Sequence, residues 1–102
     1  MPFWYLIPVP ALSEPGAQIV RLVQWLVQDG EEFHAGTRLA IVETAANRFV
    51  VLANGDGFVR ERLCPEGARL KPGAPLARAD ADSENIPYGR PYSTAEWTGS
   101  GK

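Results

Sequence analysis

The side chains best suited to covalent or metal chemistry in this chain are a single histidine, His34, and a single cysteine, Cys64. A catalytic histidine works with an orienting carboxylate and a nucleophile. The sequence specifies neither at a usable spacing from the polar turn that contains His34. One histidine and one cysteine do not make a zinc set. Cys64 matches Val27 in the repeat described below and is therefore expected to lie within a strand, where cysteine is typically a small core residue. We therefore predict no enzyme activity, no metal and no cofactor.

Composition narrows the function classes further. The 102 residues suffice for one domain with a modest core, and ten scattered basic residues stand against twelve acidic ones, giving a net charge of −2. Without a basic patch, nucleic acid is not an expected partner. A single cysteine excludes an intrachain disulfide and fits a reducing cytoplasm. Pro8 and Pro10 interrupt the apolar start, which has no basic flank, so we expect neither a signal peptide nor a membrane span.

The chain contains an internal repeat with an offset of 37 residues, the separation of Gly30 from Gly67. Each half reads as an apolar strand, an acidic–glycine turn, a second glycine and a Leu-Ala strand. The matched pairs are Leu26 with Leu63, Asp29 with Glu66, Gly30 with Gly67, Phe33 with Leu70, Gly36 with Gly73, Leu39-Ala40 with Leu76-Ala77, and Glu43 with Asp80. Two copies are too few for a solenoid, and neither half can bury a face alone. The repeat therefore predicts a sandwich with pseudo-two-fold symmetry.

Short strands joined by turns are the elements that this repeat requires. The segment from Val20 to Val27 is rich in β-branched and aromatic residues, which indicates a strand with one buried face. A helix over residues 17–28 is disfavoured, because its apolar residues do not cluster at three- and four-residue spacing. The ten glycines and nine prolines suit frequent turns. We predict an all-β fold, a flattened barrel or sandwich of two four-stranded antiparallel sheets.

Residues 43–57 read ETAANRFVVLANGDG. This segment resembles the hairpin of lipoyl domains, in which roughly E-T-D-K-A precedes an apolar strand and then A-P-x-D-G, and the two align without a gap. The 37-residue repeat is also similar to that of the lipoyl and biotinyl attachment domains, which the chain resembles from about Pro8 to Ala81. The resemblance implies the two-sheet fold of that family over residues 1–82.

Ala46 stands where the resemblance places the lipoylated lysine of the family, at the exposed tip of a hairpin. Alanine has no amine to acylate. Lys71 lies in a turn of the second half, Lys102 is the last residue, and no Met-Lys-Met-like biotin site is present. The resemblance thus implies a lipoyl-like domain that can be neither lipoylated nor biotinylated.

Two functions are compatible with such a domain. The first is a non-enzymatic binding or scaffolding module. Its protein partner would be an acyltransferase or dehydrogenase subunit of a 2-oxo acid dehydrogenase-type complex, or another multienzyme complex. The alternative is a regulatory decoy that competes with true lipoyl domains for a lipoate ligase or a dehydrogenase.

The candidate contact surface is the hairpin tip with one flanking face. The predicted register pairs Glu43 with Arg48, Ile41 with Val50, Val42 with Phe49, Ala40 with Val51, and Leu39 with Leu52. Ile41 and Val50, extended by the leucine pair, would form a solvent-facing apolar stripe where the family commonly has acidic residues. Either a protein partner or a second copy covers this stripe, or Phe3-Trp4-Tyr5 or the C-terminal tail does. The predicted interaction residues are Ile41, Thr44, Ala45, Ala46, Asn47, Arg48 and Val50.

Residues 83–102 differ in composition from the rest of the chain. They have no hydrophobic periodicity and are interspersed with proline and glycine, so we predict an extended or disordered tail. The tail is either a solvated terminus or a docking segment. Its candidate anchors are Ile86, Tyr88, Tyr92 and Trp97, and the two tyrosines could instead pack back on the domain.

Overall fold

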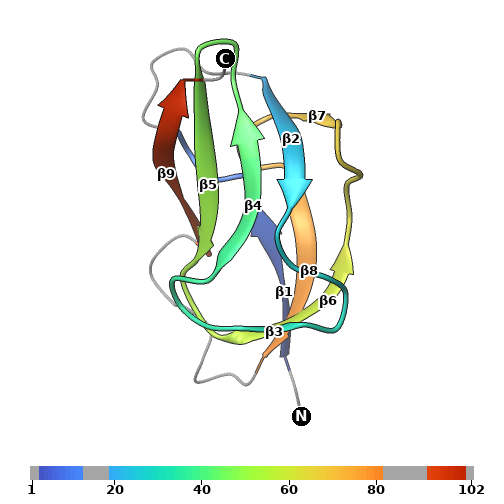
Figure 1. Ribbon diagram of the computed structural model, residues 1–102. Helices are drawn as coiled ribbons and strands as arrows, with labels where there is room; N and C mark the ends of the chain where they lie inside the picture. The colour runs from blue at the N-terminus through green and yellow to red at the C-terminus, as the bar shows by residue number, and fades with distance from the viewer. Residues whose placement is uncertain (1–2, 13–18, 82–91, 101–102) are drawn as a thin grey trace.

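A computed structural model describes residues 3–12, 19–81 and 92–100, and within these ranges every regular element is a β-strand (Figure 1). The strands are β1 Phe3–Pro8, β2 Val20–Trp25, β3 Glu32–Phe33, β4 Arg38–Glu43, β5 Asn47–Ala53, β6 Gly57–Arg62, β7 Arg69–Leu70, β8 Pro75–Ala81 and β9 Ser93–Ser100. No helix in these described ranges is long and apolar enough to cross a membrane.

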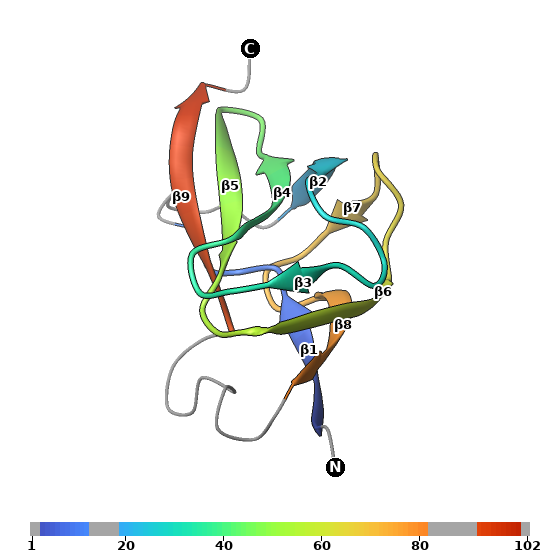
Figure 2. The same ribbon diagram turned by 60° about the horizontal axis from the view of Figure 1, so that its bottom comes forward.

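The strands form two antiparallel sheets that lie against each other as layers (Figure 2). One sheet has the order β1-β8-β6-β3, and the other has the order β7-β2-β4-β5-β9. The predicted all-β sandwich is confirmed. The second sheet has five strands rather than the expected four, because β9 pairs antiparallel with β5 along its whole length.

The core lies between the two layers and follows from the period-two alternation of the strands. On β5 the inward row is Phe49, Val51 and Ala53, and on β1 of the opposite sheet it includes Tyr5 and Ile7. Complete burial of such an aliphatic or aromatic side chain stabilises a fold by roughly 1.5–3 kcal/mol. The core therefore holds the two halves of the repeat against each other.

The 37-residue repeat reappears in the backbone hydrogen bonds. The N–H of Gly30 donates to the carbonyl of Val59 (2.6 Å), and the N–H of Gly67 donates to the carbonyl of Leu22 (2.7 Å). The four glycines that the repeat aligns have φ angles of 87°, 91°, 92° and 91°, in the order Gly30, Gly36, Gly67 and Gly73. Only glycine adopts this left-handed region without steric cost. The predicted pseudo-two-fold relation is confirmed at the level of single bonds.

The β4–β5 hairpin has the predicted register at its distal end. Glu43 lies opposite Arg48 and Ile41 opposite Val50. The predicted pairing of Leu39 with Leu52 is wrong, because a bulge between Arg38 and Ala40 shifts the strand by one residue, so that Arg38 pairs with Leu52. A bulge leaves one residue without a cross-strand partner. Leu39 is buried in the core, so it does not extend an outer stripe.

Within the predicted tail, the described residues are held on the domain at the start of β9. The rings of Tyr92 and Tyr5 lie with their centroids 4.7 Å apart, and the buried Ser93 hydroxyl donates to the carbonyl of Pro8 (2.7 Å). Residues 93–100 are thus a strand of the second sheet. The other candidate anchors, Ile86 and Tyr88, lie outside the described residues.

Candidate functional site

The tip of the β4–β5 hairpin is a short turn organised by the Thr44 side chain. The Thr44 hydroxyl oxygen accepts hydrogen bonds from the backbone N–H groups of Ala46 (3.2 Å) and Asn47 (3.0 Å). The backbone N–H of Thr44 donates to the carbonyl of Asn47 (2.8 Å). A hydroxyl that satisfies turn amides in this way fixes the backbone locally. The turn therefore presents Ala45 and Ala46, both exposed, in a defined conformation.

Below the turn, Glu43 is held between two arginines. The guanidinium of Arg21 on β2 donates through Nε (3.0 Å) and Nη2 to Glu43 Oε1, and Arg48 Nη2 donates to Oε2 (3.1 Å). These hydrogen bonds, that from Arg21 first and that from Arg48 second, lower the pKa of the Glu43 carboxyl below its usual value. The three side chains form a cross-strand row over β2, β4 and β5, which fixes the strands beneath the tip.

The C-terminal strand reaches the same tip. The indole Nε1 of Trp97 donates to Oδ1 of Asn47 (3.1 Å), and the Thr98 hydroxyl donates to the carbonyl of Arg48 (3.1 Å). Trp97 is nevertheless 60% exposed. A large exposed aromatic surface is thus joined to Asn47, the residue that follows the two alanines of the turn.

The β4–β5 hairpin lies within a segment of the chain that matches a known protein family. The biotin–lipoyl family, described as "Biotin-requiring enzyme", matches residues 6–78. The chain belongs to the biotin–lipoyl attachment family. No curated protein sequence matches the chain. Domains of this family are carriers rather than catalysts, and they typically sit within multienzyme complexes. The family match ends before β9, so the strand that carries Trp97 lies beyond it.

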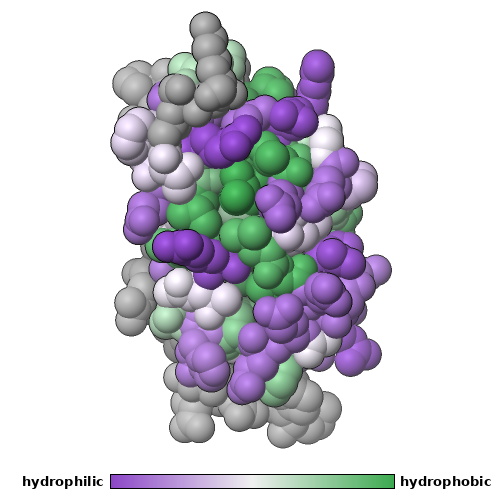
Figure 3. All heavy atoms as spheres, viewed as in Figure 1, coloured by the Kyte–Doolittle hydropathy of each residue, from purple (hydrophilic) through white to green (hydrophobic). Residues whose placement is uncertain are grey.

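The biotin–lipoyl domain presents only part of its predicted contact surface to solvent. Ala45 and Ala46 are exposed, whereas Thr44, Asn47, Arg48 and Ile41 are half-buried. Val50 is only 5% exposed. Figure 3 shows an apolar strip over the outer face of β4 and β5, with hydrophilic side chains on both sides. The predicted residues therefore lie in one region, but Ile41 and Val50 expose less apolar surface than the predicted solvent-facing stripe would.

Two residues of this region were missed by sequence reasoning as members of the tip. Arg21 lies on a strand that is distant in sequence, and only the register of β2 against β4 places it opposite Glu43. Trp97 was recognised as an aromatic anchor in the tail, but its position beside Asn47 depends on the pairing of β9 with β5. No short-range signal in the sequence specifies either contact.

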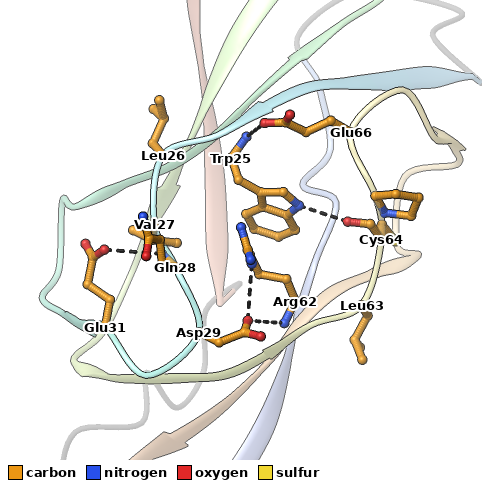
Figure 4. A pocket seen from close by; sticks show the side chains of 11 residues that line it. Trp25, Leu26, Val27, Gln28, Asp29, Glu31, Arg62, Leu63, Cys64 and Glu66 are labelled. Carbon is orange, nitrogen blue, oxygen red and sulfur yellow. Dashed lines mark hydrogen bonds and ion pairs between the residues drawn. The ribbon is translucent and has the colours of Figure 1, made fainter.

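A separate hollow lies on the pseudo-two-fold axis of the domain (Figure 4). Its two walls are related segments, 25–29 and 62–66. Asp29 Oδ1 accepts the backbone N–H of Arg62 (2.9 Å), and Glu66 Oε2 accepts the equivalent N–H of Trp25 (2.8 Å). Since both carboxylates bind backbone amides of the opposite segment, their role is to join the two halves. This arrangement does not provide a free acid and base.

The histidine and the cysteine also have structural contacts. His34 Nδ1 lies 3.7 Å from Asp56 Oδ1, a neighbour that the sequence spacing did not reveal. That carboxylate also accepts the N–H of Ala35 (3.0 Å), so it anchors the turn. Cys64 lies in a bend beyond the end of β6 and is half-buried, so the prediction that it lies within a strand is wrong. Its thiol donates to the carbonyl of Pro75 (3.4 Å), and burial raises the pKa of the thiol. Among the described residues, no three acidic, histidine or cysteine side chains are grouped to hold a metal ion.

Proposed function

We propose that this chain is a lipoyl-like protein-binding module that carries neither a lipoyl nor a biotinyl group. It docks through its hairpin tip on a 2-oxo acid dehydrogenase-type or another multienzyme complex. The observation that supports this most is the exposed Ala46 at the tip of an otherwise intact hairpin. A carrier needs a nucleophilic amine at this point, and a methyl group cannot form the amide bond.

The ordered structure of the tip supports a retained binding function rather than a loss of function. The Thr44 hydroxyl satisfies the turn amides, and the Arg21–Glu43–Arg48 row holds the strands beneath it. A preorganised surface loses little conformational entropy when a partner docks. The tip therefore resembles a fixed recognition surface, not a relaxed loop.

The side chains at the tip also have the composition of an interaction centre. Trp97, exposed over most of its surface, is bonded to Asn47 at the base of the turn, and the side chains of Arg21 and Arg48 hold Glu43 on the neighbouring strand. Tryptophan and arginine are the residue types that most often dominate binding energy at protein interfaces. The small alanines allow a partner surface to approach the turn closely.

The first test is acylation by a purified lipoate ligase, followed by intact mass measurement. Wild type should gain no lipoyl group, because Lys71 lies in a different turn. Ala46→Lys should be modified, and Ala45→Lys, one position away, is the matched control for register. Modification of the wild type would contradict the proposal. Failure of Ala46→Lys would show that this tip has diverged from ligase recognition, while leaving protein docking intact.

The second test measures binding to purified acyltransferase and dehydrogenase subunits by calorimetry. Trp97→Ala should weaken a specific complex by about tenfold or more, as loss of a central aromatic contact does. Leu63→Ser is the control, because Leu63 is an exposed apolar residue of the other repeat half, away from the tip. Equal weakening by both variants would argue against docking through the tip.

The decoy function makes a different prediction for the same proteins. It rests on the preserved turn and register of the hairpin. A decoy should inhibit lipoylation of a true lipoyl domain in proportion to its concentration, and it should do so without being consumed. A binding module of a complex should leave that rate unchanged.

A further inference from the structure

The outer face of the four-stranded sheet carries three large apolar side chains in contact with solvent. Trp4 is 59% exposed, Phe58 51% and Leu6 42%. Trp4 and Phe58 both lie opposite Asp80, on the two sides of β8, and Leu6 lies opposite Arg78. The Arg78 guanidinium also stands over the Trp4 ring, 4.8 Å from its centroid. Aromatic residues gathered with arginine on one exposed face are typical of protein interfaces.

The pseudo-two-fold relation makes this face the counterpart of the outer face of the other sheet. There, the row Arg48–Glu43–Arg21 occupies the positions that Trp4–Asp80–Phe58 occupy here. One row is closed by ion pairs between its own members. The other places two aromatic rings beside a single carboxylate. The two faces have the same geometry but different chemistry.

The two sheets also differ in whether the edges of the equivalent strands β1 and β5 are paired. In the repeat, β1 corresponds to β5, since β1 pairs with β8 as β5 pairs with β4. The outer edge of β5 is paired with β9, whereas β1 is the last strand of its sheet among the residues that the structure describes. An unpaired edge displays backbone donors and acceptors that can bind another strand.

The sequence of β1 does little to protect that edge. Phe3–Pro8 reads FWYLIP and contains no charged residue. Natural edge strands are usually protected by lysine, inward charges or proline. Here Pro8 limits only one end, because it lacks an N–H. Within residues 3–7, alternate residues direct their N–H and C=O groups away from β8 and so can pair with another strand, and Tyr5 is the centre of this segment.

We propose that β1 pairs antiparallel with β1 of a second copy, about a two-fold axis at Tyr5, and joins the two four-stranded sheets into one. A shift of the pairing by one residue would place outward-facing side chains opposite inward-facing ones. A two-fold axis at Tyr5 avoids this, because it places Trp4 opposite Leu6 of the second copy, and both face outward. Each row then reads Asp80, Trp4, Leu6, Arg78 across the axis. Apolar side chains meet in the middle, and opposite charges flank them. This self-complementarity favours a second copy over an unrelated strand.

The inference is independent of the docking proposed for the hairpin tip, because the tip and β9 belong to the other sheet. It is tested by sedimentation velocity of the full chain over a wide concentration range. Wild type should pass from monomer to dimer as the concentration rises. Leu6→Arg should raise the dimer dissociation constant by about tenfold or more, since a charge on an edge strand opposes pairing.

Leu63→Arg is the matched control, because Leu63 is 40% exposed against 42% for Leu6 and lies just beyond the end of β6, which β8 separates from β1. This variant should dimerise as wild type does. Trp4→Arg is a second variant of the edge strand. Because Trp4 is more exposed than Leu6, this variant should fold normally. Circular dichroism melting of each variant separates loss of dimer from loss of fold.

Hydrogen exchange locates the contact. Amides of β1 should gain protection as the concentration of wild type rises, and Leu6→Arg should lose this gain. A monomer at every concentration would overturn the inference, as would a dimer that Leu6→Arg leaves unchanged. Concentration-dependent protection of β9 instead of β1 would assign the contact to the other sheet. Concentration-independent protection of the β1 amides that point away from β8 would indicate cover from within one chain, which also overturns it.

Discussion

The indole of Trp97 donates a 3.1 Å hydrogen bond to the side-chain oxygen of Asn47, and so ties the C-terminal strand to the hairpin tip. Asn47 is the first residue of β5 and follows directly after Ala46. The tip is therefore supported from two sides, by the Thr44 turn within the hairpin and by a strand from outside the family match.

This contact predicts the effect of Trp97→Phe. The substitution keeps an aromatic ring but removes the donor, so the free energy of unfolding should fall by roughly 0.5–1 kcal/mol, the usual net value of one exposed hydrogen bond. Urea unfolding measures this change, and hydrogen exchange of the tip amides should become faster. Trp4→Phe makes the same ring change on the opposite sheet and should leave tip exchange as it is. Unchanged tip exchange in Trp97→Phe would contradict the support from β9.

Gly57 is required because there is no space for a side chain, whereas the four repeat glycines are required for their positive φ angles. A Cβ at this position would lie 2.7 Å from the backbone oxygen of Asp80 and 3.1 Å from the ring of Phe33. Gly57→Ala should therefore destabilise the domain by roughly 1–3 kcal/mol, because the backbone of β8 has to move. Gly36→Asn is the contrast. Gly36 has φ +91° but open space around it, and asparagine tolerates the left-handed region. Chemical denaturation should show the larger loss for Gly57→Ala.

Glu43 predicts a dependence of stability on acid pH. Because its pKa in the folded state lies below the usual value of 4.5, the folded protein favours the ionised form. The stabilisation is complete above that value and is lost as the pH falls through the lower folded pKa. Glu43→Gln should remove this part of the acid dependence, so that the denaturation midpoint falls less steeply as the pH decreases below 4.5. An equally steep acid profile in the variant would exclude the Arg21–Glu43–Arg48 row as its source.

Tyr5 predicts the opposite behaviour at alkaline pH. Burial, with smaller contributions from Tyr92 and Asp56, raises the pKa of Tyr5 from 10.0 to about 12. The folded state thus favours the neutral phenol. Its contribution to stability is complete below pH 10 and declines as the pH rises towards the folded value of about 12. Tyr5→Phe should lose stability less steeply than wild type in that window, as followed by denaturant unfolding at stepped pH.

The two carboxylates of the axial hollow provide a test of the repeat. Asp29→Ala and Glu66→Ala each remove the acceptor of one backbone N–H in the opposite half. Loss of each backbone contact should cost about 1 kcal/mol of unfolding free energy, and Asp29→Ala should lose slightly more, because Asp29 Oδ1 also accepts a hydrogen bond from Nε of Arg62 (3.2 Å). Thermal unfolding compares them, with Glu61→Ala as an exposed acidic control on the neighbouring strand. A large difference between the two variants would mean that the halves do not share this support.

The two-sheet fold was predictable because its signals repeat. The paired glycines mark turns that only glycine adopts freely, and each occurs twice at the same offset, so the pattern constrains the topology. The Ile41–Val50 and Glu43–Arg48 pairs followed from the length of the hairpin loop. The bulge at Leu39 did not, because an extra residue in a strand leaves no mark on an apolar run such as Leu39-Ala40.

The site was less predictable than the fold, because its parts come together through pairing at long range. Arg21 is joined to Glu43 across two strands, and Trp97 reaches Asn47 only after β9 has joined the sheet. The segment from Ser93 to Ser100 has little apolar alternation. It is held by backbone pairing with β5, and the side chains of Thr94, Glu96, Trp97 and Thr98 are exposed. Composition therefore indicated a tail where a strand exists.

The bond between the Ser93 hydroxyl and the carbonyl of Pro8 spans 85 residues, and this has a consequence for synthesis. β1 pairs with β8, and the outer edge of β5 pairs with β9, so neither pairing can form until the ribosome has made most of the domain. Topologies dominated by such distant pairings fold slowly, and strand edges left open in the meantime are prone to aggregation. The nascent chain should therefore need chaperone protection until the latest stage at β5, whose partner β9 is the last of the described strands to emerge.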